Sequence, residues 1–161
     1  TRRKRTSMKI SIRRASLNHV AGIAKLFDAY RVFYQQKSDP ELALKFLTDR
    51  LSADESVIYF AEDESGNYLG FTQLFATFSS VSAETMWILN DLYVDRAARG
   101  HGVGTQLMNA ARDYSVETGA KGLTLSTATD NTTAQSLYET LGYERDTEYY
   151  SYYLATPAQT G

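Results

Sequence analysis

A glycine-rich stretch in the second half of the chain has the residue types that bind phosphate. Residues 92–105 read LYVDRAARGHGVGT, in which an apolar run typical of a strand leads through glycines into a helical pattern. Glycines let backbone N–H groups approach a phosphate closely, and the free N–H groups and dipole of a helix N-terminus attract the anion. Arg99 could add a bidentate cationic clamp at the loop entrance. We therefore expect this loop to bind a pyrophosphate.

Two common nucleotide-binding motifs do not fit the stretch. A P-loop ends in Gly-Lys-Ser/Thr, whereas Gly104 is followed directly by Thr105. A dinucleotide-binding fingerprint needs a third glycine or alanine three residues after its second glycine, and Leu107 occupies that position. The sequence therefore favours a different phosphate-binding loop.

Several other chemistries lack the side chains they require. The chain contains no cysteine, and it has no Gly-x-Ser-x-Gly elbow that would present a nucleophilic serine. Disulfides, thiolate metal sites and a cysteine nucleophile are thereby excluded, and we expect no metal.

Length and composition predict one globular domain. The 161 residues are 43% hydrophobic and 22% charged, which provides enough apolar material for a core. The net charge of −2 argues against nucleic-acid binding, and no apolar run is long enough to cross a membrane. The lack of cysteine makes a cytoplasmic location the default expectation. We assign residues 1–8 to a basic arm or cloning remnant, 9–155 to the domain and 156–161 to a tail.

Hydrophobic periodicity predicts that the domain begins with a strand and two helices. Residues 9–14 alternate apolar and polar side chains, as a half-buried strand does. Residues 17–34 repeat apolar side chains at helical spacing. A second helix is expected at 39–51, because Asp39-Pro40-Glu41 supplies a cap, a first-turn proline and an acid.

The rest of the chain predicts strands interrupted by two helices. Strands are expected at 57–61, 68–78 and 84–94, a helix at 102–118, a strand at 123–128, a helix at 131–141, and final strands at 143–145 and 148–155. The order β-α-α-β-β-β-α-β-α-β-β predicts an α/β fold, with a mixed, mostly antiparallel twisted sheet and helices on both faces.

Two motifs together give the sequence a family resemblance. The loop contains Arg-x-x-Gly-x-Gly at Arg99, Gly102 and Gly104. Residues 131–143 read NTTAQSLYETLGY, which matches Asn-x-x-Ala-x-x-Leu-Tyr-x-x-x-Gly-Phe/Tyr. Both motifs resemble those of the GNAT superfamily of N-acetyltransferases, and the resemblance covers residues 9–155. It implies the acyl-CoA N-acyltransferase fold, acetyl-CoA as cosubstrate, and direct attack of an amine on the thioester.

The resemblance also implies which residues bind the cofactor. The backbone of the strand before the loop would pair with the pantetheine arm, and the loop would surround the pyrophosphate. The implied cofactor-binding residues are Leu92, Tyr93, Val94, Arg99, Gly100, His101, Gly102, Val103, Gly104, Thr105 and Asn131. Asn131 could equally cap the helix that follows, and the two roles are compatible.

Tyr138 matches the family tyrosine that protonates the departing thiolate. A phenol with a reference pKa of about 10 can donate to a thiolate, whose reference pKa is about 8.5, when the geometry is favourable. Ala134, Leu137 and Leu141 share one helical face with Tyr138, so a place in the core is the alternative.

Asp91 is the candidate that accepts the proton of the amine. Residues 90–94 read NDLYV and resemble the same stretch in polyamine acetyltransferases and in fungal histone and D-amino-acid acetyltransferases, the members nearest in these motifs. The resemblance implies that Asp91 acts as a base through water, or that its charge orients an ammonium group. A structural role at a strand distortion is the alternative.

The acceptor side is predicted from position and residue type. The resemblance places the first two helices and the turn before Glu84 along the acceptor groove. The candidate acceptor-binding residues there are Tyr30, Phe33, Tyr34 and Glu84, and the aromatic residues could bracket a cationic amine. Aromatic residues at helical spacing also form cores, so that alternative stays open.

Four tyrosines near the C-terminus suggest self-association. Tyr149, Tyr150, Tyr152 and Tyr153 place aromatics on both faces of the expected last strand. A monomer normally buries one face only, and an apolar edge strand pairs readily. We expect a homodimer formed through the C-terminal strands.

The sequence therefore predicts an acetyl-CoA-dependent N-acetyltransferase that acts on a primary amine of a small molecule or peptide. A catalytically idle CoA-binding sensor is the alternative from another class, and acylation of a hydroxyl is a third. Tyr138 and Asp91 favour the enzyme, because a sensor would need neither.

Overall fold

The computed structural model describes residues 8–158. The chain forms two compact units, which divide between Ser126 and Thr127. The first unit holds the sheet and three helices, and the second holds one helix and the C-terminal segment. The expected basic arm lies outside the described residues except for Met8, and the expected tail is described up to residue 158.

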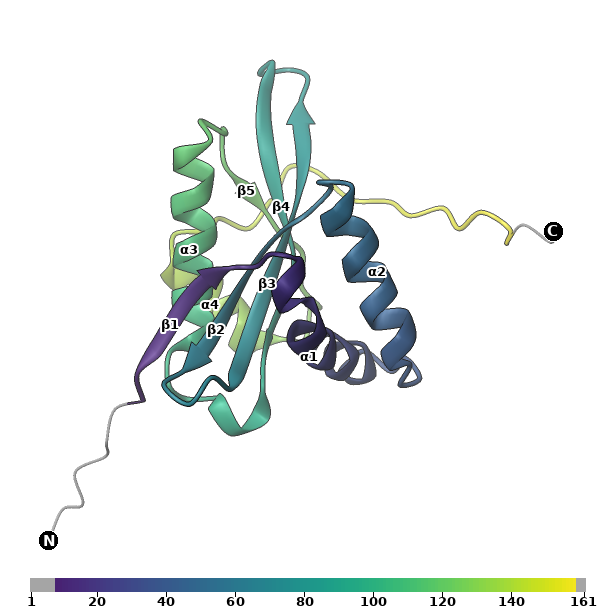
Figure 1. The fold of residues 1–161 in the computed structure, drawn as a ribbon. Helices are drawn as coiled ribbons and strands as arrows, with labels where there is room; N and C mark the ends of the chain where they lie inside the picture. Colours follow the sequence, from purple (N-terminus) through teal and green to yellow (C-terminus); the bar gives the residue numbers. More distant parts are fainter. Residues whose placement is uncertain (1–7, 159–161) are drawn as a thin grey trace, which may run out of the picture. The chain divides into compact units, whose positions relative to one another are not determined.

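Five strands, adjacent in sequence order, form the sheet of the first unit (Figure 1). They are β1 (Ile10–Arg14), β2 (Val57–Asp63), β3 (Tyr68–Ser79), β4 (Glu84–Val94) and β5 (Leu123–Thr124). The first four strands pair antiparallel, and β4 pairs parallel with β5. The expectation of a mixed, mostly antiparallel sheet is confirmed.

Three helices cover the two faces of this sheet. They are α1 (Val20–Phe33), α2 (Pro40–Ser52) and α3 (Val103–Glu117), and two short 3-10 helices, η1 (Leu17–His19) and η2 (Arg96–Ala98), precede α1 and α3. α1 and α2 lie on one face, and α3 lies on the other (Figure 1). Helices on both faces are therefore confirmed.

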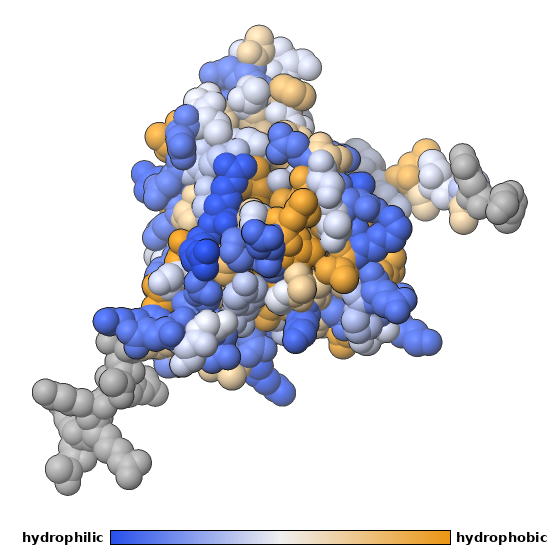
Figure 2. Space-filling view, viewed as in Figure 1, coloured by the Kyte–Doolittle hydropathy of each residue, from blue (hydrophilic) through white to orange (hydrophobic). Residues whose placement is uncertain are grey.

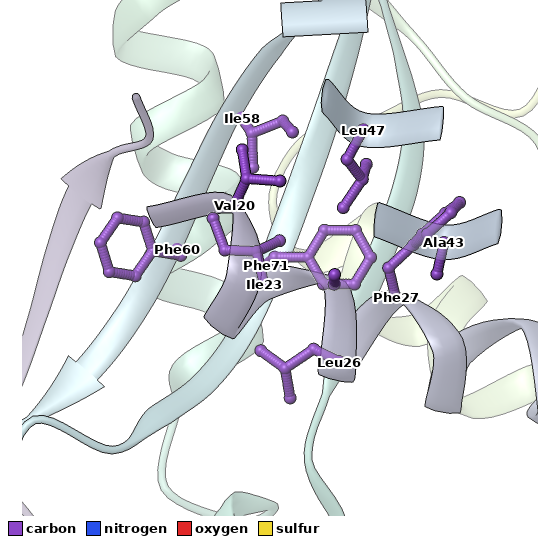
Figure 3. Close-up of a cluster of buried hydrophobic side chains, with 10 residues drawn as sticks. Val20, Ile23, Leu26, Phe27, Ala43, Leu47, Ile58, Phe60 and Phe71 are labelled. Atoms are coloured by element: carbon purple, nitrogen blue, oxygen red, sulfur yellow. The ribbon is translucent and has the colours of Figure 1, made fainter. Parts of the chain in front are cut away.

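The larger apolar cluster lies between the sheet and the first two helices. Ile23 of α1 and Leu47 of α2 pack with Phe60 and Phe71, which project from β2 and β3 (Figure 3). Apolar residues also show on the surface beside η1 and between the sheet and α2 (Figure 2). Tyr30 lies on the same face of α1 and extends the cluster towards β4.

A second cluster holds α3 against the opposite face of the sheet. Val103 and Leu107, from the first turns of α3, pack with Leu69 of β3. Gly70 allows this close approach, because a Cβ there would lie 2.7 Å from the carbonyl oxygen of Tyr93 and 3.3 Å from Cγ1 of Val103. The packing therefore fixes the N-terminus of α3 beside the end of β4.

One extra residue in β4 interrupts its pairing with β3. Gln73 pairs with Asp91 and Leu74 pairs with Leu89, so Asn90 has no partner on β3. A β-bulge of this kind bends the strand and changes the faces to which side chains project. The distortion proposed for this position is therefore present.

The C-terminal third departs from the expected element order. β5 comprises Leu123–Thr124 alone, and the described residues after it include one helix, α4 (Thr132–Thr140), and no strand. The predicted strands at 143–145 and 148–155 are therefore wrong. A strand exists through hydrogen bonds to a neighbouring strand, and an alternating apolar pattern does not supply that neighbour.

Candidate active site

Asp91 is a buried carboxylate held by three hydrogen-bond donors. It lies on β4 with 5% of its surface exposed. Gln73 donates from Nε2 to Oδ2 at 2.6 Å, and Asn90 donates from Nδ2 to Oδ1 at 3.2 Å. The Tyr30 hydroxyl also hydrogen-bonds the carboxylate. These donors compensate for part of the water that the carboxylate loses on burial.

Burial raises the pKa of Asp91 above its ordinary value of 3.8. Loss of water disfavours the charged form, whereas the hydrogen bonds from Gln73, Tyr30 and Asn90 act in the opposite direction. Because desolvation is the largest cause, Asp91 is a stronger base than an exposed aspartate.

The bulge directs Asp91 towards α1. Leu89 pairs with Leu74, which follows Gln73 and therefore lies on the opposite face of β3. In a regular strand Leu89 and Asp91 would share a face, because they are two residues apart. The extra residue, Asn90, instead places Asp91 on the face that carries Gln73 and α1.

Aromatic side chains of α1 and β4 surround the position of Asp91. The ring centroid of Tyr30 lies 5.0 Å from that of Tyr34 and 6.1 Å from that of Tyr93. Phe33 packs edge-on against Tyr34 with centroids 5.3 Å apart, and both rings are more than half exposed. The predicted residues Tyr30, Phe33 and Tyr34 thus form a continuous series of rings that reaches from the surface to Asp91.

Glu84 lies far from this cluster. It is exposed at the start of β4, where it pairs with Ser79 in the extended β3–β4 hairpin (Figure 1). It lies seven positions before Asp91 along β4, and seven steps of an extended strand span about 23 Å. The structure therefore does not bring Glu84 together with the other residues predicted on the acceptor side.

The glycine-rich loop joins the end of β4 to α3. Gly100 and Gly102 have φ angles of +82° and +76°, in the left-handed region that favours glycine. No side chain caps α3, whereas Asp39 caps α2 by accepting the N–H of Leu42. The first N–H groups of α3, on residues 103–105, therefore form a helix N-terminus suited to an anion. His101 is exposed within the same loop.

The end of β4 presents backbone groups on an edge that no described strand pairs with. β5 pairs with β4 at two positions only, both before the bulge. Asp95 N donates to Leu69 O at 2.7 Å, which makes Val94 part of a non-hydrogen-bonded pair with β3. The N–H and C=O groups of Val94, and by alternation those of Leu92, therefore point away from β3.

Arg99 folds back onto the end of β4. Its Nε donates to the carbonyl oxygen of Val94 at 3.1 Å, and its guanidinium carbon lies 5.9 Å from the ring centroid of Tyr93. The charge of Arg99 therefore lies at the entrance of the loop, where the side chain contacts Val94 and Tyr93.

Asn131 and Tyr138 belong to the second unit. Asn131 Oδ1 accepts the N–H of Ala134 at 3.1 Å, which confirms its role as the cap of α4. Tyr138 is half-buried, and its ring centroid lies 6.1 Å from that of Tyr143. α4 has no fully buried residue, so Tyr138 is not a fully buried core residue.

The sequence analysis missed Gln73, which is completely buried and in direct contact with Asp91. A glutamine within the apolar start of β3 was the available signal, because a buried amide requires polar partners. Its partner could not be identified without the register between β3 and β4.

Residues 8–158 offer neither a cluster of metal-binding side chains nor a membrane-spanning helix. These residues contain no group of three or more His, Cys, Asp or Glu side chains that could hold a metal ion. They also contain no helix that is long and apolar enough to cross a membrane.

The sequence matches known acetyltransferases over most of its length. The model of the acetyltransferase (GNAT) family matches residues 22–143. The uncharacterized N-acetyltransferase YhfO of Bacillus subtilis (strain 168) is 51% identical over 150 residues, which cover 93% of this chain and 100% of that protein. The D-amino-acid N-acetyltransferase HPA3 of Saccharomyces cerevisiae is 28% identical over 126 residues, which cover 76% of this chain and 77% of that protein.

A solved structure shares the fold. The crystal structure of a probable acetyltransferase matches with a TM-score of 0.87 and 43% identity, and the match covers 92% of this chain and 99% of that one. The family resemblance, the enzyme class and the fold class expected from the two motifs are thereby confirmed. The chain belongs to the acetyltransferase (GNAT) family.

Proposed function

We propose that the chain is an acetyl-CoA-dependent N-acetyltransferase that acetylates the primary amine of a small molecule or peptide. The observation that carries the proposal is the environment of Asp91, a buried carboxyl with a raised pKa beside aromatic rings, on the strand that leads into the glycine-rich loop. A carboxylate and aromatic faces together attract a cation. An ammonium group must lose a proton before its nitrogen can attack a thioester.

The loop and the end of β4 fit the two parts of the cosubstrate that need binding. The uncapped N-terminus of α3 and the left-handed Gly100 and Gly102 offer backbone N–H groups to a pyrophosphate. The unpaired edge at Leu92 and Val94 offers backbone hydrogen bonds to the pantetheine amides. When bound, acetyl-CoA supplies the activated acetyl group. The remaining proposed contacts are Tyr93, Arg99, His101, Val103, Gly104, Thr105 and Asn131.

Asp91 attracts the ammonium group and accepts its proton, directly or through a water molecule. Its burial gives it a pKa closer to that of a working base than an exposed aspartate has. Tyr30, Tyr34 and Phe33 provide ring faces for the cation. HPA3 acts, by its name, on D-amino acids, so D-amino acids belong among the acceptors to be tested.

Tyr138 returns a proton to the thiolate. It occupies the tyrosine position of the Asn131–Tyr143 motif, and its half-buried position on α4 leaves part of the side chain accessible. A neutral phenol can serve as a general acid when it is positioned at the leaving group.

The first prediction concerns transfer to a panel of amines. With acetyl-CoA and polyamines, D- and L-amino acids, aminoglycosides and lysine peptides, we expect thiol release with at least one cationic amine. Asp91→Asn should lower kcat/KM for that amine by about 10²–10⁴-fold, the range typical of acid–base groups, without weakening acetyl-CoA binding. CoA binding without turnover on any acceptor would contradict the proposal and indicate a sensor.

Glu84→Gln is the matched control, because it neutralises the distant acid on the same strand and should leave kcat/KM unchanged.

The stability of the Asp91→Asn variant gives a second test of the raised pKa. Since the folded state raises the pKa of Asp91, its stabilising contribution is complete below the ordinary value of 3.8 and is lost as pH rises through the raised pKa. Asp91→Asn should therefore resist urea better than the parent at neutral pH, and this advantage should shrink in acid.

The second prediction concerns Gly102 in the loop. Gly102→Val should abolish acetyl-CoA binding in calorimetry, because φ is +76° there and a branched side chain would obstruct the phosphate. Gly66→Val is the control, since Gly66 has a φ of +81° in the β2–β3 turn and equally open surroundings. Both variants should lose about 1–3 kcal/mol of stability through backbone strain. Retained binding in Gly102→Val would disprove the loop assignment.

The third prediction concerns Tyr138. Tyr138→Phe should lower kcat by about 10²–10⁴-fold with little change in cofactor affinity, because only proton donation is removed. Tyr143→Phe is the control in the same unit, since the buried Tyr143 hydroxyl has no hydrogen-bond partner and its loss should not slow turnover. An unchanged kcat in Tyr138→Phe, where chemistry limits the rate, would remove the general-acid role.

The fourth prediction concerns a homodimer formed through the C-terminal segment. Tyr149, Tyr150 and Tyr152 are 78%, 90% and 92% exposed, and a second copy would supply the strand partner that this segment lacks. Light scattering should give the mass of a dimer, and replacing Tyr150 and Tyr152 together by lysine should give a monomer. A monomeric mass of the parent at high micromolar concentration would refute the dimer.

A further inference from the structure

Gln73 stands out as a buried polar side chain that uses only part of its hydrogen-bonding capacity. It is 0% exposed, and Nε2 donates to Asp91 Oδ2 at 2.6 Å. Its other polar atom, Oε1, is buried and has no hydrogen-bond partner among residues 8–158. A buried carbonyl oxygen without a donor destabilises the fold. Simple anchoring of a carboxylate does not explain this oxygen, because a hydroxyl would anchor Asp91 through a single atom, whereas the amide buries a second polar atom as well.

The neighbouring threonine shows how such anchoring is otherwise achieved on β3. Thr72 Oγ1 donates to the backbone oxygen of Asp91 at 2.8 Å and is equally buried. A hydroxyl bond therefore holds the backbone at this point of β4, while an amide holds the carboxyl group. The two hydrogen bonds come from adjacent residues of β3, and only the one from Gln73 reaches the carboxyl group of Asp91.

An amide differs from a hydroxyl in carrying a donor and an acceptor on two separate atoms. A half-turn about the last side-chain torsion exchanges the positions of Nε2 and Oε1. A carboxylate needs a donor opposite its oxygen, whereas a carboxylic acid, which carries an O–H, needs an acceptor there. Both needs can thus be met by Gln73 from one position on β3.

We propose that Gln73 is the positioning residue for Asp91 in both of its protonation states: it donates to the carboxylate and, after its amide turns, accepts from the carboxylic acid. This inference rests on the proposed function, in which Asp91 takes the proton of the amine. An N–H bond of the ammonium group breaks, its electron pair stays on nitrogen, and an O–H bond forms on Asp91. The proton then passes to solvent, and the amide returns to its first orientation.

The surroundings of Asp91 make this amide the main polar partner that the sheet provides. Tyr30 of α1 hydrogen-bonds the carboxylate, and the ring of Tyr93, which follows on β4, packs against Tyr30. Burial and hydrogen bonds shift the pKa of Asp91, and no charged side chain is among the causes. The hydrogen bond from the Gln73 side-chain amide therefore contributes to setting the pKa of Asp91.

The test compares Gln73→Met, which keeps the length of the side chain but removes both polar atoms, with Thr72→Val, which removes the equally buried bond to the backbone. The hydrogen bond that Gln73 makes to the charged carboxylate is stronger than the one it makes to the neutral acid, so the loss of both raises the pKa of Asp91. The acidic limb of kcat/KM should therefore move up by about one pH unit in Gln73→Met, which lowers activity on that limb about tenfold. Thr72→Val should leave the limb in place, and KM for acetyl-CoA should not change in either variant.

Gln73→Glu provides a second variant that keeps the volume and the polarity of the site. Two carboxyl groups at hydrogen-bond distance cannot both ionise readily, so the acidic limb should move up further than in Gln73→Met. An acidic limb that stays in place in both Gln73 variants, while each remains folded by circular dichroism, would overturn the proposal.

A spectroscopic measurement separates this inference from the proposed function. In the protein without substrates, the carboxyl carbon resonance of Asp91, assigned with Asp91→Asn, should titrate at higher pH in Gln73→Met than in the parent. The side-chain amide resonances of Gln73 should follow the Asp91 titration in the parent. If no amine is acetylated but these shifts occur, Asp91 is not the base of a transfer reaction, whereas the proposed pairing of Gln73 with both protonation states of Asp91 still holds. Amide signals that stay constant through the Asp91 titration would refute the turn of the amide.

Discussion

The single extra residue at Asn90 is the constraint on which the site depends. Side chains alternate along a strand, so the addition of one residue moves every later side chain to the other face. If residues 89–91 formed a regular strand instead of a bulge, Asp91 would share the face of Leu89 and would not meet Gln73 or Tyr30. The pairing of β4 with β5 also lies entirely before this point. The bulge therefore separates the part of β4 that pairs with β5 from the part that carries Asp91 and has one edge that no described strand pairs with.

Burial of this carboxylate ties the chemistry to the stability of the fold. Asp91 lies at the margin of the apolar layer between α1 and the sheet, where loss of water raises its pKa. Tyr30 joins the two environments, because its ring packs with Phe71 while its hydroxyl reaches the carboxylate. Hydrogen bonds from three elements hold the group but do not restore its lost hydration. The fold therefore accepts a destabilising charge at a position where the proposed function requires a raised pKa.

The regular elements and the loop could be predicted from the sequence, because their signals are local. Helical spacing, the Asp39 cap and the spacing of the loop glycines each depend on residues a few positions apart. A strand distortion at Asp91 was only one of the alternatives that the sequence left open, because no residue type in NDLYV marks a bulge and only the register with β3 reveals the extra residue. Gln73 was missed for the same reason. The C-terminal strands were predicted wrongly because their pattern carries no information about a pairing partner.

The last four residues of β4 project to two different sides of the sheet. Asp91 and Tyr93 project towards α1, where the amine is proposed to bind, whereas Leu92 and Val94 pack in the cluster that holds α3. The backbone groups of these latter two residues point to the unpaired edge proposed for the cosubstrate. Under the proposed function, substitutions among the exposed aromatics of α1 would therefore change the acceptor without disturbing the packing that positions the glycine-rich loop. Such separation allows one scaffold to keep a common acetyl donor while the amine it recognises changes.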